Sequence, residues 1–133
     1  MESVQIIATS TPTVTVEPIK TEFGDKPSPD FPTNIPLEQK VKINQSYGLD
    51  YIGQKQLTIV FMSMKTVKQN YDLYFNFLKE DGWIISNKYE SEKLASLSSL
   101  YGTKGNNEIN VTTSSNDFGS TTKSMINISV LKK

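Results

Sequence analysis

The chain of 133 residues contains no cysteine and no histidine. Without cysteine there is no disulfide, no thiolate nucleophile and no cysteine-ligated metal. Without histidine the chain lacks the usual general base near neutral pH and the commonest ligand of transition metals. A hydrolase built on Ser-His-Asp or Cys-His is therefore excluded. We expect no enzyme, and no catalytic, cofactor-binding or metal-binding residues.

The chain also lacks an excess of charge and a long apolar run. Its 14 lysine and arginine residues balance 14 aspartate and glutamate residues, so nothing attracts a phosphate polymer or an anionic lipid surface. We therefore expect no nucleic-acid partner. No stretch approaches the roughly 20 apolar residues of a membrane-spanning helix, and the start of the chain has no basic region typical of a signal peptide. Membrane attachment is expected only through an anchor that is not present in this sequence.

Proline is absent after residue 36, because all six prolines stand at positions 12, 18, 27, 29, 32 and 36. Proline fixes φ and removes a backbone donor, and together with serine and threonine it is typical of an extended spacer. We therefore predict a tether or strand-forming arm over residues 1–36 and a single domain over residues 37–133. A tether favours an extracytoplasmic location. A cytoplasmic protein with a disordered terminus is the alternative.

One part of the arm has the alternation of a β-strand. Val4, Ile6 and Ala8 occupy alternate positions, and Val14 and Val16 alternate with threonines. Such a strand could stay unpaired, pair with its own domain, or add to the sheet of a neighbouring subunit. The last possibility would make the protein a structural subunit that assembles with copies of itself.

A single helix is predicted between residues 66 and 82. Thr66 and Gln69 stand at the two positions of a capping box, and Gly82 stands where a left-handed residue ends a helix. The predicted buried stripe contains Val67, Tyr71, Tyr74, Phe75 and Leu78, widened by Leu73 and Phe77.

Apolar alternation predicts strands over residues 37–47, 56–65, 83–89, 93–101, 108–114 and 122–131. Residues 48–53 are predicted to form a turn between the first two strands. The strand over residues 56–65 is apolar on both faces, so we expect it inside the sheet. The predicted fold class is α+β, with a single helix packed on an antiparallel sheet of five to six strands in the order β-β-α-β-β-β-β. The second face of the sheet is expected to be wet, and any apolar side chain on it is a docking candidate.

The helix and its flanks resemble a loose pattern of small uncharacterised bacterial cell-envelope domains. In those domains an anchor and a Pro/Ser/Thr tether precede a strand-helix-Gly-Trp-strand unit. The matching residues here are Tyr71, Tyr74, Phe75, Leu78, Gly82 and Trp83. The chain differs from the pattern because it has no lipobox cysteine. The resemblance implies an envelope location and supplies no catalytic residues.

Three tyrosines outside the helix are candidates for partner binding, since tyrosine is favoured in recognition surfaces. They are Tyr47, Tyr51 and Tyr101, and Val4 and Ile6 of the arm join them. The predicted function is a non-enzymatic extracytoplasmic binding or scaffolding module of a bacterial cell envelope, with a protein or another cell-surface component as its partner. The alternative is a structural subunit of a filament or particle assembled through its N-terminal strand.

Overall fold

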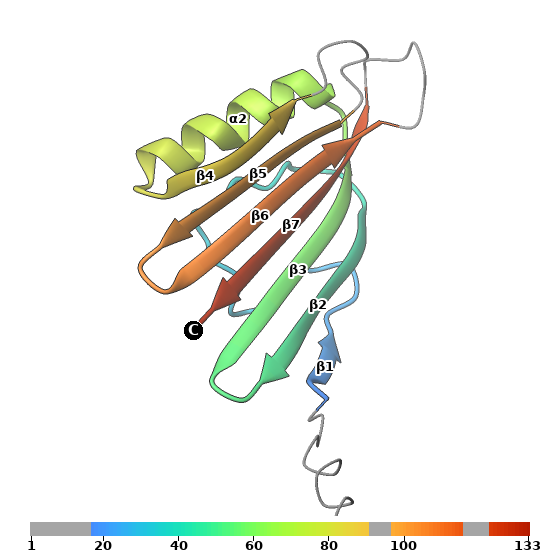
Figure 1. Cartoon of the computed structure of the whole chain (residues 1–133). Helices are drawn as coiled ribbons and strands as arrows, with labels where there is room; N and C mark the ends of the chain where they lie inside the picture. Colours follow the sequence, from blue (N-terminus) through green and yellow to red (C-terminus); the bar gives the residue numbers. More distant parts are fainter. Residues whose placement is uncertain (1–16, 91–96, 116–122) are drawn as a thin grey trace, which may run out of the picture.

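The computed structural model describes residues 17–90, 97–115 and 123–133. In these ranges the chain forms seven strands and one helix (Figure 1). The elements are β1 (Ile19–Glu22), β2 (Ile43–Tyr51), β3 (Gln54–Ser63), α2 (Val67–Glu80), β4 (Ile84–Glu90), β5 (Leu97–Lys104), β6 (Asn107–Ser114) and β7 (Ser124–Lys132). The strands form one sheet in the spatial order β1-β2-β3-β7-β6-β5-β4, and every neighbouring pair is antiparallel.

The predicted α+β class, with one helix on an antiparallel sheet, is confirmed for the described residues. The predicted strand number is wrong, because the sheet has seven strands rather than five to six. The additional strand is β1, which lies inside the segment expected to be an arm. The stretch between Pro18 and Pro27 contains no proline, so its backbone donors are free to pair with β2. The order along the chain is therefore β-β-β-α-β-β-β-β.

The chain crosses the sheet once and then returns to its middle. After β3, helix α2 carries the chain to the far edge, where β4 lies, and β4 to β7 then form a meander. Strand β7 ends between β6 and β3, so that Ile128 of β7 pairs with Ile59 of β3 and Val111 of β6. The expected interior position of the strand over residues 56–65 is confirmed, because β3 lies between β2 and β7.

The hairpin between β2 and β3 is tighter than predicted. Strand β2 begins at Ile43 and continues to Tyr51, and only Ile52 and Gly53 form the turn. Gly53 adopts a φ of 81°, which a residue without a side chain accepts at little cost. Residues 48–50, which were expected to turn, instead pair with β3. The hairpin thus brings Tyr47 and Tyr51 onto one strand.

Helix α2 begins and ends where the sequence predicts. The Thr66 hydroxyl accepts from the Gln69 amide at 3.0 Å, and the Gln69 side chain accepts from the Thr66 amide at 2.9 Å. Gly82 adopts a φ of 86° and ends the helix. Leu73 is 38% exposed rather than buried, because it lies about 100° around the helix from Tyr74, which faces the sheet.

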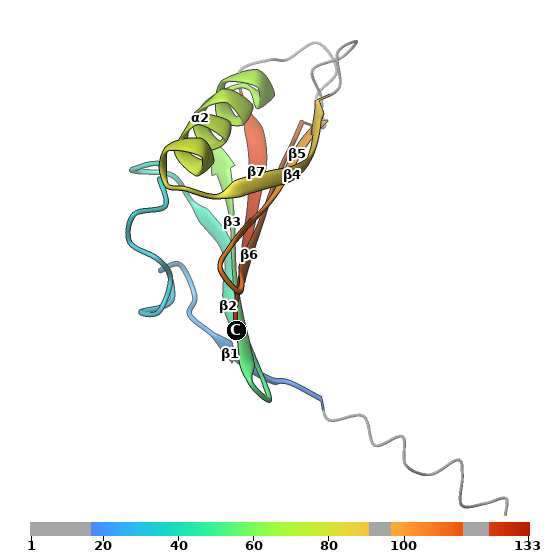
Figure 2. The same ribbon diagram turned by 60° about the vertical axis from the view of Figure 1, so that its left-hand side comes forward.

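Helix α2 and residues 24–42 lie on the same side of the sheet (Figure 2). The helix packs on β4, β5 and β6. Residues 24–42 form neither helix nor strand, yet Phe31 and Ile35 are only 5% and 4% exposed and belong to the core. The Tyr74 hydroxyl donates to the Pro36 carbonyl at 2.6 Å and fixes this segment to the helix. The structure therefore differs from the expected tether over residues 17–36, since proline removes backbone donors but does not prevent side-chain burial.

The hydrophobic core lies between the sheet and this cover. It is built from inward-facing residues at alternate positions of the four central strands, namely Leu57, Ile59, Phe61, Leu100, Ile109, Val111, Ile126, Ile128 and Val130. The alternate residues of the same strands consequently point to the opposite face.

Candidate functional site: the open face of the sheet

The side of the sheet opposite α2 carries no helix or connecting segment within the described ranges (Figure 2). We call this side the open face and define it by the outward residues of the five inner strands. They are Tyr47, Leu49 and Tyr51 of β2, Gln56, Thr58, Val60 and Met62 of β3, Met125, Asn127, Ser129 and Leu131 of β7, Glu108, Asn110, Thr112 and Ser114 of β6, and Leu97, Ser99, Tyr101 and Thr103 of β5.

The strand register arranges these side chains in rows across the sheet. One row runs from Tyr47 through Thr58, Ser129 and Asn110 to Tyr101, because each residue is paired with the next. With strands about 4.8 Å apart, the two tyrosines stand about 19 Å from each other. The three residues between them have shorter side chains. The row therefore forms a shallow polar trough with an aromatic ring at each side.

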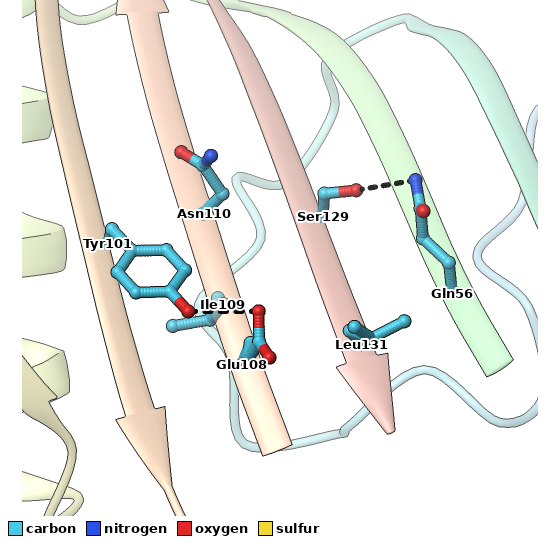
Figure 3. A pocket seen from close by; sticks show the side chains of 7 residues that line it. All are labelled: Gln56, Tyr101, Glu108, Ile109, Asn110, Ser129 and Leu131. Carbon is cyan, nitrogen blue, oxygen red and sulfur yellow. Dashed lines mark hydrogen bonds between the residues drawn. The ribbon is translucent and has the colours of Figure 1, made fainter. Parts of the chain in front are cut away.

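A hollow of about 260 Å³ lies in the Tyr101 half of this trough (Figure 3). Its lining residues come from four neighbouring strands and are Gln56, Tyr101, Glu108, Ile109, Asn110, Ser129 and Leu131. Since regular strands hold all of these residues, the hollow is preformed rather than assembled from loops.

The charged group in the hollow is already neutralised. Glu108 accepts from the Tyr101 hydroxyl at 2.9 Å and from the Lys133 ammonium at 2.6 Å. The bonds from Lys133 and Tyr101 lower the pKa of Glu108. A general acid working near neutral pH needs the opposite shift, a raised pKa. Glu108 is therefore held as the ionised acceptor of these two bonds.

Hydroxyl and amide groups form the rest of the floor of the trough around the hollow. The Gln56 amide donates to Ser129 at 3.1 Å and to Thr58 at 3.3 Å, and the two hydroxyls share a bond of 2.8 Å. These bonds occupy the amide nitrogen of Gln56 and leave its side-chain oxygen without a partner among the described residues. The Asn110 amide, which is exposed, has no side-chain partner in the same part of the chain. The hollow thus presents unused donors and acceptors to a ligand.

The three tyrosines predicted as partner-binding residues all lie on the open face. Tyr101 borders the hollow, Tyr47 forms the other side of the trough, and Tyr51 lies at the hairpin end of β2. The Lys20 ammonium lies 4.7 Å from the centre of the Tyr47 ring. The other two candidates, Val4 and Ile6, lie outside the described residues.

The polar residues between the two tyrosines could not be identified as a site from the sequence. Asn110 and Ser129 alternate with buried residues, as surface positions of any strand do. They become neighbours only because β7 inserts beside β6. No local pattern in the sequence predicts the pairing of β7 with β6.

Two other features of the described ranges are weaker candidates for a functional site. No group of three or more Asp and Glu residues there is placed to hold a metal ion. A second hollow, of about 730 Å³, runs along the proline-rich segment from Lys26 to Gln39. Phe31 and Ile35, which line it, already belong to the core. The open face is therefore the better candidate site.

No protein-family model, no curated protein and no solved structure matches the chain. Among the described residues, α2 is too short and too polar to cross a bilayer. Function is consequently inferred from the geometry of the open face.

Proposed function

We propose that the protein is a non-enzymatic binding module of a bacterial cell envelope, located outside the cytoplasm, and that it binds its partner through the open face. One observation carries the proposal: a seven-stranded sheet is covered on one side by α2 and residues 24–42 and is left bare on the other. The bare side presents tyrosines next to free hydrogen-bonding groups.

The composition of the open face supports a role in recognition. Tyrosine supplies a large contact area at low entropic cost, and serine and asparagine supply adaptable hydrogen bonds. The open face combines Tyr47 and Tyr101 with Ser129 and Asn110 in one row. The envelope location is supported by the resemblance of the helix to envelope domains.

Cosedimentation with envelope fragments of the organism that encodes the chain tests the proposal. The wild-type protein should sediment with the fragments, and a Tyr47→Ala/Tyr101→Ala variant should sediment about tenfold less, as expected when aromatic anchors of an interface are removed. The matched control is Ile19→Ala/Leu73→Ala, which removes exposed apolar side chains that do not point to the open face. The control should sediment like the wild type.

Circular dichroism must first show that both variants are folded. The proposal fails if the wild-type protein does not sediment, or if the tyrosine variant and the control behave alike.

A second function, as a subunit of a filament or particle, is favoured by the position of β1. This strand forms one edge of the sheet, and its four residues are all exposed. At such an edge, backbone groups are available to another strand.

Deletion of residues 1–16 separates the two functions, because it leaves β1 and the open face intact. A subunit should form oligomers that the deletion abolishes, as measured by light scattering. A binding module should be unchanged in mass and should still sediment with envelope fragments.

A further inference from the structure

We infer that the ligand of the open face is an uncharged, hydroxyl-rich chain, a neutral glycan of the cell envelope, held between Tyr47 and Tyr101. This inference rests on the proposed function and specifies the chemistry of its ligand.

The charged groups of the trough favour a neutral ligand. The hollow contains one carboxylate, Glu108, and the 2.6 Å bond from Lys133 balances it. Lys55 of β3 and Lys132 of β7 point to the covered side of the sheet. There Lys55 binds Asp30 at 2.8 Å and Lys132 donates to the Asp30 carbonyl at 2.7 Å. A phosphate-rich or carboxylate-rich ligand needs unpaired cations. Among the described residues the only unpaired cation beside the trough is Lys20, whose ammonium lies over the Tyr47 ring at the far side from the hollow. One lysine is too little for a polyanion, so the ligand of the hollow is neutral.

The centre of the trough is polar. Protein interfaces concentrate aromatic residues, methionine and arginine at their centre, and serine is depleted there. The centre of this trough has the opposite composition, with Thr58, Ser129 and Asn110 in one row. An apolar partner would displace water from these groups and would offer no hydrogen bonds in its place. A ligand that carries hydroxyls along its length can pair with the exposed Asn110 and the half-buried Ser129. Thr58, which is 4% exposed, supports Ser129 from below through their shared bond of 2.8 Å.

Free polar atoms of the hollow lie beside apolar surface. The Asn110 amide and the Gln56 side-chain oxygen are available as donor and acceptors, while Leu131 and the Tyr101 ring supply apolar surface beside them (Figure 3). A sugar ring has the matching surfaces, with hydroxyls at its edge and C–H groups on its faces. Amphipathic rings such as tyrosine suit such a ligand.

The size of the hollow indicates how the ligand binds. Its volume of about 260 Å³ lies below the roughly 300–1,000 Å³ of sites that enclose a drug-sized molecule. The hollow therefore holds a small part of a longer chain, and the rest lies across the trough. Affinity for a short oligosaccharide should be weak, with Kd in the range of about 1 mM.

An NMR titration of the full ¹⁵N-labelled chain tests the inference with three neutral probes, cellotetraose, chitotetraose and mannotetraose. At least one probe should shift the amide signals of Tyr101, Asn110 and Ser129 in a saturable manner. Asn110→Ala should weaken that binding about tenfold, whereas Asn76→Ala, an exposed control on α2, should leave it unchanged. The inference is overturned if no probe shifts the open face, or if a sulfated oligosaccharide binds more tightly.

Envelope fragments distinguish failure of this inference from failure of the proposed function. Periodate cleaves glycans that contain vicinal diols, and chitinase or lysozyme cleaves 1,4-linked N-acetylglucosamine chains, which lack them. One of these two treatments should abolish cosedimentation, while protease treatment of the fragments should not. If cosedimentation depends on Tyr47 and Tyr101 but is lost only after protease treatment, the partner is a protein. The binding module then stands and the glycan is excluded.

Discussion

Replacement of Asn70 by alanine should destabilise the protein strongly, although the residue lies on a helix and is polar. Asn70 is 1% exposed. Its amide donates to Ser63 at 3.0 Å and to Ser124 at 2.9 Å. Ser63 in turn donates to Glu38 at 2.6 Å, and Ser124 donates to the Lys65 carbonyl at 2.8 Å. One amide therefore connects α2, β3, β7 and the segment before β2.

The expected loss follows from these contacts. Each buried hydrogen bond contributes about 1 kcal/mol net, and the two serine oxygens that lose a donor stay desolvated. The space left by the amide adds a cavity term. Together these effects should lower the free energy of unfolding by about 2–4 kcal/mol, out of the roughly 5–15 kcal/mol typical of a domain.

Urea unfolding, followed by the fluorescence of Trp83 and by circular dichroism, measures this loss. With an m-value of about 2 kcal/mol/M, the midpoint should fall by roughly 1–2 M while m stays constant. Asn76→Ala is the matched control, because Asn76 lies on the same helix and is exposed. The control should stay within about 0.5 kcal/mol of the wild type. Equal midpoints for the two variants would refute the role of the buried network.

Three further predictions concern the cover, the helix end and the hollow. Tyr74→Phe removes the bond to the Pro36 carbonyl, so stability should fall by about 1–2 kcal/mol and hydrogen exchange in residues 24–42 should accelerate; unchanged exchange would show that this bond does not hold the cover. Gly82→Ala places a side chain at a φ of 86° and should cost about 1 kcal/mol in urea unfolding, whereas no loss would mean that the helix end relaxes. The hydrogen bond to Glu108 raises the pKa of Tyr101 above its ordinary value of 10.0, because a nearby carboxylate opposes formation of the phenolate. Glu108→Gln should therefore lower the pKa of Tyr101, as followed by NMR of its ring, and an unchanged pKa would argue against the bond in solution.

The helix could be predicted from the sequence because its signals are local. Thr66 and Gln69 are three residues apart, and Gly82 follows the last turn directly. Burial of Asn70 could not be predicted, since a polar residue at a helix position that faces the sheet is buried only when partners such as Ser63 and Ser124 arrive from distant strands. Tertiary contacts decide such positions.

The cover over residues 24–42 and the strand β1 were missed for a related reason. Prolines predict extended backbone without sheet pairing. Residues 24–42 indeed form no strand, but turns and bends interrupt their backbone, so it is not extended throughout. The prolines do not indicate whether Phe31 and Ile35 are buried against a surface of another part of the protein. That surface exists because the sheet is wider than α2 alone can cover.

The candidate site was predictable only as separate residues. Tyr47 and Tyr101 stand out in the sequence because they lie outside the helical stripe. Their common row depends on four strand pairings, including the insertion of β7 between β3 and β6. Pairing between strands that are distant in sequence leaves no local pattern, so the trough and its Asn110–Ser129 floor emerge only from the fold.

Hydroxyl-radical footprinting of the protein bound to envelope fragments tests the role of the open face most directly. Compared with the free protein, the bound protein should show reduced oxidation at Tyr47, Tyr101 and Met125, which lie on the open face. Oxidation of Leu73, which is exposed on α2, should not change. Protection of Leu73 with unchanged oxidation of the open face would contradict the proposed binding mode.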